Sequence, residues 1–397
     1  MTGRDGRALL AVMPALAVIA ACLLIPLLWT LATAVRDPEL SATLPRSAVL
    51  LRAWDGHGLP GEATYAAMAT ELKAASETQA LGPLARRMNF EQSGLRVLLM
   101  HAAEAELSPP YAASMTALDA RWGERATWLR LQRASGPFTD LYLLRALDLD
   151  RTPDGTVVAV PAEQAVFRTL FLRTLEISLH VTVLCLVIGY PVAWTITVLP
   201  RFWSGVATAL VLVPFWMSVL VRTTAWLILL QREGPLNDLL QALHLTDGPL
   251  QLIFTRTAVY IAMVHVLLPF VVVPLTGVMR RINPAYLQAA ESLGAGAWAR
   301  FQRVYFPMTL PGVAAGGLIT FMMAVGFYIT PALVGGPDDQ LVSTWIADYI
   351  NADLNWGMAA ALAVGLLGMT AAVVVLARLL LPAPARPGAL GPEEAGS

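Results

Sequence analysis

The stretch at residues 283–312, NPAYLQAAESLGAGAWARFQRVYFPMTLPG, decides the fold that we expect for this chain. Asn283 is a good helix N-cap, and Pro284 suits the first turn of a helix. A short helix is therefore predicted at residues 285–293, and Gly294 ends it. The stretch is too polar to span a bilayer and too long to be a simple turn.

A second short helix is expected at residues 298–305, after Gly296, and Pro307 and Pro311 then lead into an apolar run. Two short helices around a glycine elbow would form a compact knob between two membrane spans. Four arginines crowd this knob: Arg280, Arg281, Arg300 and Arg303. Because cytoplasmic loops carry an excess of basic residues, we expect the knob on the cytoplasmic face.

The composition is that of an integral membrane protein. Of 397 residues, 56% are hydrophobic and 14% are charged, and the mean hydropathy is +0.60; a soluble domain carries about a quarter charged residues. The net charge of −1 gives no indication of nucleic-acid binding. Lys73 is the only lysine and lies in no glycine-rich loop, so the sequence has no Walker-type ATP site. Cys22 and Cys185 fall in apolar segments, and we expect both to be buried.

Six transmembrane helices are predicted, and with them an all-α integral membrane protein. The spans are expected at residues 8–35, 169–199, 202–230, 257–279, 312–334 and 356–381. The first apolar run continues well past Cys22, which favours an uncleaved helix over a lipoprotein signal. A polar connection at residues 231–255 and a loop at residues 335–355 are expected on the outer side. The Pro- and Gly-rich tail at residues 382–397 is expected to be disordered.

Residues 36–168, called the insert below, differ in kind from the spans. They hold 14 basic and 16 acidic residues, more than half of the charges in the chain. Apolar residues recur at helical spacing in the ranges 63–75, 94–106 and 114–134, and a short strand is expected at residues 156–160. We therefore expect four parts: an N-terminal span at 1–35, a mostly helical extracytoplasmic insert, a five-helix core at 169–381, and the tail. His57 and His101 have no metal-ligand partners at a useful spacing.

The distribution of arginine sets the expected orientation. If the N-terminus is inside, nine arginines fall in cytoplasmic segments, and only Arg232 and Arg256 fall in the short outer loops. This bias places both termini in the cytoplasm and the insert outside.

The residues around the glycine elbow resemble a known motif. The pattern Gln288-Ala289-Ala290, then Gly294, then Val304-Tyr305-Phe306-Pro307 resembles the EAA loop of ABC-transporter permease subunits. In that family the loop is a coupling helix that docks in a cleft of the ATP-binding subunit. The chain departs from the family at Gln288, where the family has Glu, and at Phe306, where it has an aliphatic residue; Glu291 follows one turn after Gln288. The resemblance implies an ATPase-coupling role for these residues: Gln288, Ala289, Ala290, Glu291, Gly294, Arg300, Val304 and Pro307.

Other phrases resemble permeases for spermidine and putrescine. They are LVPFW at 212–216, Arg222, Trp226, REGPLN at 232–237, YITP at 328–331 and LVGG at 333–336. The resemblance covers roughly residues 169–381. It implies one transmembrane subunit of a bacterial inner-membrane importer, with polyamine or a related small solute as cargo and alternating access as the mechanism.

The resemblance also implies partners: an ABC ATPase dimer, a second permease subunit, a periplasmic substrate-binding protein and the membrane lipid. ATP and Mg would be used by the ATPase, and this chain would bind no cofactor itself.

Ionisable residues inside spans are costly and are candidates for function. We expect Glu176 and Arg222, with Trp226 and Tyr328, to line the translocation path. The alternative is that Arg173 and Glu176 pair with each other, and that Arg222 meets backbone carbonyls. A cationic cargo would also favour aromatic and acidic side chains at the outer mouth, namely Asp338, Asp339, Trp345 and Asp348. Those carboxylates could equally be solvated loop charges or contacts to a binding protein.

A hypothesis from a different class is a membrane-anchored sensor or scaffold that acts through the insert. It predicts that the isolated insert folds and binds a ligand or partner. It gives no reason for the EAA-like pattern.

Overall fold

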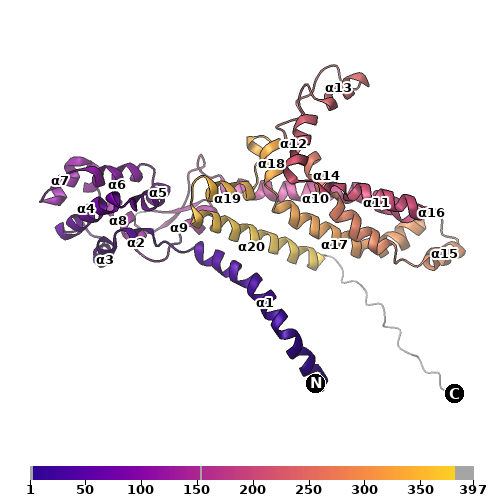
Figure 1. Cartoon of the computed structure of the whole chain (residues 1–397), viewed down its shortest axis with the longest axis horizontal. Helices are drawn as coiled ribbons and strands as arrows, with labels where there is room; N and C mark the ends of the chain where they lie inside the picture. The colour runs from indigo at the N-terminus through magenta and orange to yellow at the C-terminus, as the bar shows by residue number, and fades with distance from the viewer. Residues whose placement is uncertain (1–2, 153, 381–397) are drawn as a thin grey trace. The chain divides into compact units, whose positions relative to one another are not determined.

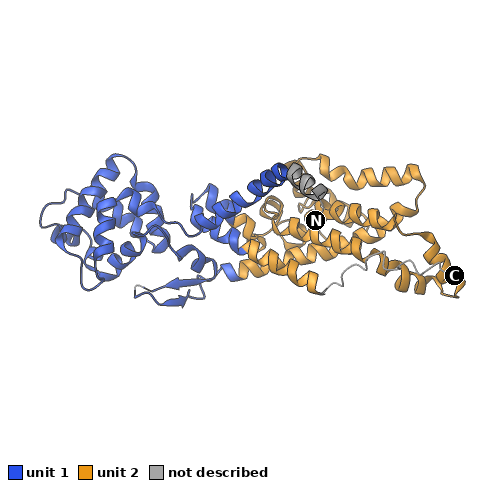
Figure 2. Cartoon of the chain, turned by 90° about the horizontal axis from the view of Figure 1, so that it is seen from below, with its two compact units in different colours: residues 1–168, 346–365 blue, residues 169–345, 366–397 orange. Residues whose placement is uncertain are grey.

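The structure, a computed structural model, describes residues 3–152 and 154–380. The expected disordered tail lies outside the described residues. The chain divides into two compact units, coloured separately in Figure 2. Unit 1 holds residues 1–168 and 346–365, and unit 2 holds residues 169–345 and 366–397.

Most of the described residues are helical, as the sequence predicts (Figure 1). The first helices are α1 (Gly3–Thr33), α2 (Glu39–Thr43), α3 (Pro45–Ala53), α4 (Glu62–Glu77), α5 (Leu81–Glu91), α6 (Leu95–Glu104), α7 (Tyr111–Leu118), η1 (Ala120–Gly123), α8 (Arg125–Ala134) and α9 (Leu141–Ala146). Two short antiparallel strands follow, β1 (Leu149–Arg151) and β2 (Val157–Ala159), with Asp150 opposite Val158. The strand expected at 156–160 is therefore one arm of a hairpin.

The described residues of the second half form helices joined by loops, with no strand among them. Its helices are α10 (Phe167–Val198), α11 (Arg201–Trp216), α12 (Val219–Leu229), α13 (Pro235–Ala242), α14 (Arg256–Met279), α15 (Pro284–Ser292), α16 (Ala297–Arg300), the π-helical turn η2 (Phe301–Tyr305), α17 (Phe306–Val325), α18 (Ile329–Val334), η3 (Pro337–Asp339), α19 (Val342–Asn351) and α20 (Trp356–Leu380).

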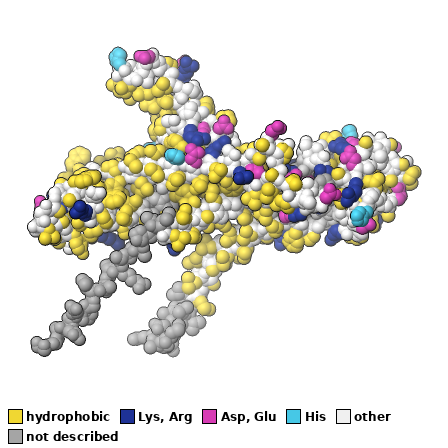
Figure 3. Space-filling view, turned by 180° about the vertical axis from the view of Figure 1, so that it is seen from behind, with side chains coloured by type: hydrophobic (Ala, Val, Ile, Leu, Met, Phe, Trp, Pro, Cys, Tyr) yellow, Lys and Arg dark blue, Asp and Glu magenta, His cyan; other side chains and the backbone are white. Residues whose placement is uncertain are grey.

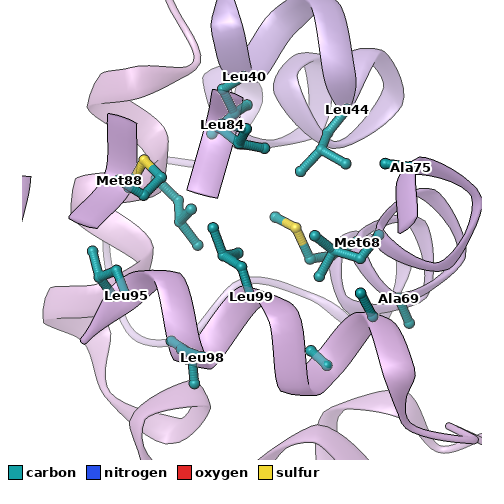
Figure 4. Close-up of a cluster of buried hydrophobic side chains, with 14 of the residues drawn as sticks. Leu40, Leu44, Met68, Ala69, Ala75, Leu84, Met88, Leu95, Leu98 and Leu99 are labelled. Carbon is teal, nitrogen blue, oxygen red and sulfur yellow. The ribbon is translucent and has the colours of Figure 1, made fainter. Parts of the chain in front are cut away.

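The insert has a hydrophobic core of its own. Side chains from α2 to α8 meet in one buried cluster, in which Leu44, Met68, Leu84 and Leu99 are fully buried (Figure 4). Every residue of this cluster lies between residues 40 and 134. The amphipathic spacing seen in the sequence is therefore satisfied within the insert, because each helix turns its apolar stripe toward the others.

A buried chain of charges also crosses the insert. The guanidinium of Arg87 contacts Asp37 at 2.5 Å and Glu91 at 3.0 Å, and Glu91 in turn contacts Arg133 at 2.8 Å. The side chains of Arg87, Asp37 and Glu91 are each at most 5% exposed. Buried charges require such partners, since each isolated one would lose several kcal/mol of solvation.

Among the described residues, five helices are long and apolar enough to cross a membrane, or six if one bent pair counts as a single span. The bent pair corrects the single span expected at 202–230. It consists of α11 and α12, which meet at an angle of 101° around Met217 and Ser218. Pro214 lies in the last turn of α11, where it removes a backbone donor and weakens the continuation of the helix.

The fifth span also differs from the expected 312–334. The helix runs without a gap from Ala297 to Val325, and α18 is a separate short helix. Pro307 and Pro311 do not interrupt it. The π-helical turn η2 ends two residues before Pro307, and the Phe306 amide donates to the Phe301 carbonyl five residues back. A widened turn accommodates the missing proline donor inside a continuous helix.

The two spans that flank the 280–311 loop, α14 and α17, pack closely on each other. A Cβ added to Gly316 would lie 3.1 Å from the Val271 Cα and 3.2 Å from its carbonyl oxygen, and one added to Gly312 would lie 3.0 Å from the Val278 Cβ. Small residues four apart allow two membrane helices to approach at backbone distance.

Charged and apolar side chains are segregated. On the face shown in Figure 3, charged side chains gather over the insert, and the surface of the spans is largely hydrophobic. Cys185 is buried as expected, but Cys22 is exposed on the apolar surface of α1, which corrects that expectation.

Candidate functional site

The first helix of the 280–311 loop is capped as predicted. The Asn283 side chain accepts a hydrogen bond of 3.0 Å from the Ala285 amide, and Pro284 occupies the first turn. This arrangement satisfies one of the free amides at the helix start. The helix α15 ends at Ser292, one residue before the end that the sequence predicts.

Gly294 forms the elbow through a left-handed backbone conformation, with φ of +84°. The Gly294 amide donates to the Glu291 carbonyl at 2.8 Å, and the Ala295 amide donates to the Ala290 carbonyl at 3.0 Å. These two bonds make a Schellman motif, which requires a left-handed residue at this position. The conformation fixes the direction in which α16 leaves α15.

The loop presents an exposed surface. None of the residues of α15 or α16 is buried. Leu293 is 88% exposed and Trp298 is 71% exposed. Glu291 and Arg300 form an ion pair of 2.5 Å that joins the two helices. Large apolar side chains on an exposed loop are typical of a surface that docks onto another protein.

An aromatic cluster anchors the loop to the spans. Phe301 in η2 lies 5.6 Å from Trp298 and 6.2 Å from Tyr190 of α10, measured between ring centroids. The hydroxyl of Tyr190 is 3.1 Å from that of Thr309 in α17. A displacement of the loop would therefore be transmitted to α10 and α17 through packed rings. Tyr190 and Phe301 could not be predicted from spacing, because two rings so far apart along the chain meet only through the packing of α10 on η2.

Arginine also ties the start of the loop to α11. The Arg280 guanidinium donates to the Ser204 hydroxyl at 2.8 Å, and Ser204 donates to the Ile196 carbonyl at 2.7 Å. The loop is thus fixed at both ends, while its middle is exposed.

The structure places the eight residues with an expected ATPase-coupling role on consecutive parts of this loop. Gln288, Ala289, Ala290 and Glu291 lie on α15, and Gly294 forms the elbow. Arg300 ends α16, Val304 lies in η2 and Pro307 lies in the first turn of α17.

Arg222, expected on the path, is buried and donates to the Pro214 carbonyl across the break between α11 and α12. This contact matches the alternative that Arg222 meets backbone carbonyls. Trp226 donates to the Nδ1 of His265 at 3.1 Å, which links α12 to α14. Tyr328 is 44% exposed and directly precedes α18, whose Thr330 contacts Thr223 of α12 at 3.1 Å.

Glu176 takes part in a charged network at one end of unit 2. Arg256 contacts Glu176 at 3.1 Å and Asp339 at 3.0 Å, and Arg173 contacts Asp338 at 3.7 Å. The alternative, in which Arg173 pairs with Glu176, is therefore wrong, because each pairs with a residue of another element. Asp339 is buried rather than solvated, and it also accepts from the Gly336 amide at 3.1 Å.

No group of three or more potential metal ligands occurs among the described residues.

Together the fold and the loop define a multi-span membrane permease. The chain belongs to the family described as the binding-protein-dependent transport system inner membrane component, whose model matches residues 186–384. The match includes the 280–311 loop and leaves out the insert.

Relatives agree with this family. The chain is 35% identical over 197 residues to the spermidine/putrescine transport system permease protein PotB of Escherichia coli K12, covering 50% of this chain and 72% of that one. It is 32% identical over 202 residues to PotB of Haemophilus influenzae, covering 51% and 71%. A crystal structure of a bacterial alginate ABC transporter, in complex with a pentasaccharide-bound periplasmic protein, aligns over 53% of this chain and 76% of that one, with 19% identity and a TM-score of 0.42.

Proposed function

We propose that this chain is a permease subunit that imports a polyamine, or a related small cation, by coupling ATP hydrolysis on a partner ATPase to alternating access. The observation that carries the proposal is the 280–311 loop. It is exposed in its middle, fixed at both ends, and joined directly to α14 and α17, which pack at backbone distance.

In this proposal the loop docks on an ABC ATPase dimer. ATP and Mg bind to that dimer, and no cofactor binds to this chain. Leu293 and Trp298 supply apolar contact area, and the ion pair of Glu291 with Arg300 keeps α15 and α16 moving as one body. Because this chain has Gln288 where the family has Glu, its docking surface lacks one carboxylate. Apolar contacts therefore supply more of the affinity for the ATPase. Both termini and the loop are cytoplasmic, following the arginine bias.

A second permease subunit completes the pore, and a periplasmic binding protein delivers the cargo. The polyamine assignment rests on the likeness to PotB. The carboxylates near Arg256 are chemically suited to a cation. Glu176 already binds one cationic group, the Arg256 guanidinium, and its side chain is half exposed and therefore accessible to another.

Gly294 provides the test of coupling. A Cβ at this position meets nothing within 4 Å in this chain, so a substitution acts through the φ of +84°. Gly294→Val strains the elbow, since β-branched residues rarely adopt that conformation, whereas Gly294→Asn tolerates it. With the partner subunits co-expressed, we expect Gly294→Val to lose at least tenfold in spermidine uptake and to retain less ATPase on purification. Gly294→Asn should keep most of both.

The coupling role is wrong if Gly294→Val transports normally with its ATPase attached. The cargo is tested separately, by the ATPase activity of the wild-type complex. A complex that responds to its loaded binding protein, but never to one loaded with spermidine or putrescine, would keep the coupling role and reject the polyamine.

A further inference from the structure

A cavity of about 480 Å³ lies within unit 1, among the end of α5, helix α8 and the β-hairpin. This volume is in the range of small-molecule sites. Its charged lining residues are the arginines Arg130, Arg133, Arg145 and Arg151 and the carboxylates Glu91 and Asp150. The cavity is separate from the 280–311 loop and outside the residues that match the family.

The carboxylates that line the cavity are too few to pair with all of its arginines. Glu91 is shared by Arg87 and Arg133, and Asp150 contacts Arg145 at 3.0 Å. Arg151 pairs with Asp140, which lies outside the lining. Within the described residues Arg130 has no carboxylate within ion-pair distance; its guanidinium only approaches the Ala126 carbonyl, at 3.4 Å. The wall therefore carries a positive charge that the chain leaves unbalanced.

Hydrogen-bond donors are in excess as well. The Nε atoms of Arg133 and Arg145 are buried and have no acceptor in the described part of the chain. Burial lowers the pKa of Arg130 and the neighbouring charge of Arg133 acts in the same direction, while the carboxylates of Glu91, Asp150 and Glu124 oppose the shift without cancelling it. A buried donor without an acceptor is destabilising, so an added acceptor would stabilise this wall.

We propose that this arginine-lined cavity binds a small soluble oxyanion, a phosphate or carboxylate compound with more than one negative charge. The planar fork of arginine matches two oxygens of such a group, and the shared chemistry covers both anions. Asn89, Gln92 and Gln164 also line the cavity and offer amides to further oxygens. A polycation is repelled by this wall, so the ligand is distinct from a polyamine cargo.

The test uses the full chain in a neutral detergent, with pyrophosphate and citrate as probes in calorimetric titrations. We expect saturable binding of at least one probe and binding at least tenfold weaker in Arg130→Gln. Arg52→Gln removes an exposed arginine of α3 that does not line the cavity, and it should bind like the wild type. Sodium chloride at equal ionic strength and spermidine should give no saturable signal.

Arg130→Lys separates loss of charge from loss of the fork, and it should bind more weakly than wild type but more tightly than Arg130→Gln. Unfolding midpoints without anion show whether each variant is folded. The proposal fails if Arg130→Gln, folded, binds both probes as tightly as the wild type. It also fails if phosphatidylglycerol in nanodiscs competes with pyrophosphate, since a lipid headgroup is then the ligand.

Discussion

At the scale of single residues, arginine supplies several of the polar contacts that hold distant elements together. Arg87 joins Asp37 to Glu91, Arg222 joins α12 to the Pro214 carbonyl, and Arg256 joins α10 to Asp339. Each of these guanidinium groups reaches acceptors on another element or turn. A lysine ammonium could not reproduce a planar, two-sided contact, so Arg→Lys is not conservative at these positions.

Glu39 gives a prediction at this scale. Burial, followed by the neighbouring Asp37, raises the pKa of the Glu39 carboxyl from 4.5 to about 7, and its Oε2 is buried without a partner among the described residues. The folded state therefore holds this proton more tightly than the unfolded state. Stability contributed by this group falls as the pH rises from about 4.5 to about 7 and is regained on acidification.

We expect Glu39→Gln to stabilise the protein by about 1–2 kcal/mol more at pH 8 than at pH 5. This figure is smaller than the full pKa shift implies, because the group is partly exposed and solvent screens its charge. Thermal unfolding of the full chain in detergent, followed by tryptophan fluorescence, measures the difference. An equal effect at both pH values would show that Glu39 titrates normally.

At the scale of elements, the pair α14 and α17 carries the 280–311 loop. Gly316 lies against the backbone of Val271, and Gly312 lies against Val278 and Leu275. The contact at Gly316 is the less forgiving, because backbone atoms cannot move aside as a side chain can. The rigidity of this pair would decide how well a push on the loop reaches the spans.

We therefore expect Gly316→Val to separate α14 from α17 and to cost about 1–3 kcal/mol or more through overpacking. Gly368→Val is the matched control in α20, because nothing lies within 4 Å of a Cβ there. The detergent unfolding midpoint should fall for the first variant and stay near wild type for the second. Equal midpoints would mean that the two spans adjust without cost.

At the scale of the whole molecule, the insert is organised around its own interior. Its core cluster lies between residues 40 and 134, and its charge chain runs from Asp37 to Arg133. The core and the buried charges are therefore contained in one continuous segment, while residues 346–365 of the same unit add outer contacts such as Tyr349 against Phe90 at 6.3 Å.

We predict that a fragment of residues 36–168 folds alone, with helical circular dichroism and a cooperative thermal transition. Asp37→Asn in the same fragment should lower the midpoint strongly, because losing one partner of a buried ion pair costs about 3–5 kcal/mol. A fragment that melts gradually, with or without the substitution, would show that the insert depends on the rest of the chain.

Much of the fold could be predicted because it depends on local chemistry. Long apolar runs identify α1, α10, α14 and α20 to within a few residues, since each run exceeds the roughly twenty residues that a bilayer requires. The cap at Asn283 and the elbow at Gly294 are also local, because each is decided by one residue and its immediate backbone.

Other features depend on partners that are distant in the sequence. Neither the 101° break between α11 and α12 nor the helix that continues through Pro307 follows from a proline alone, because a proline can end a helix or be absorbed by it. The ion-pair partners of Arg173, Glu176 and Arg256 could not be predicted from the sequence either, since each charge had several possible partners of opposite sign. Composition and spacing determine which segments are helices and spans, because those depend on neighbouring residues. Only packing in three dimensions decides where a helix bends and which charges meet, because the competing partners differ in distance and not in sequence pattern.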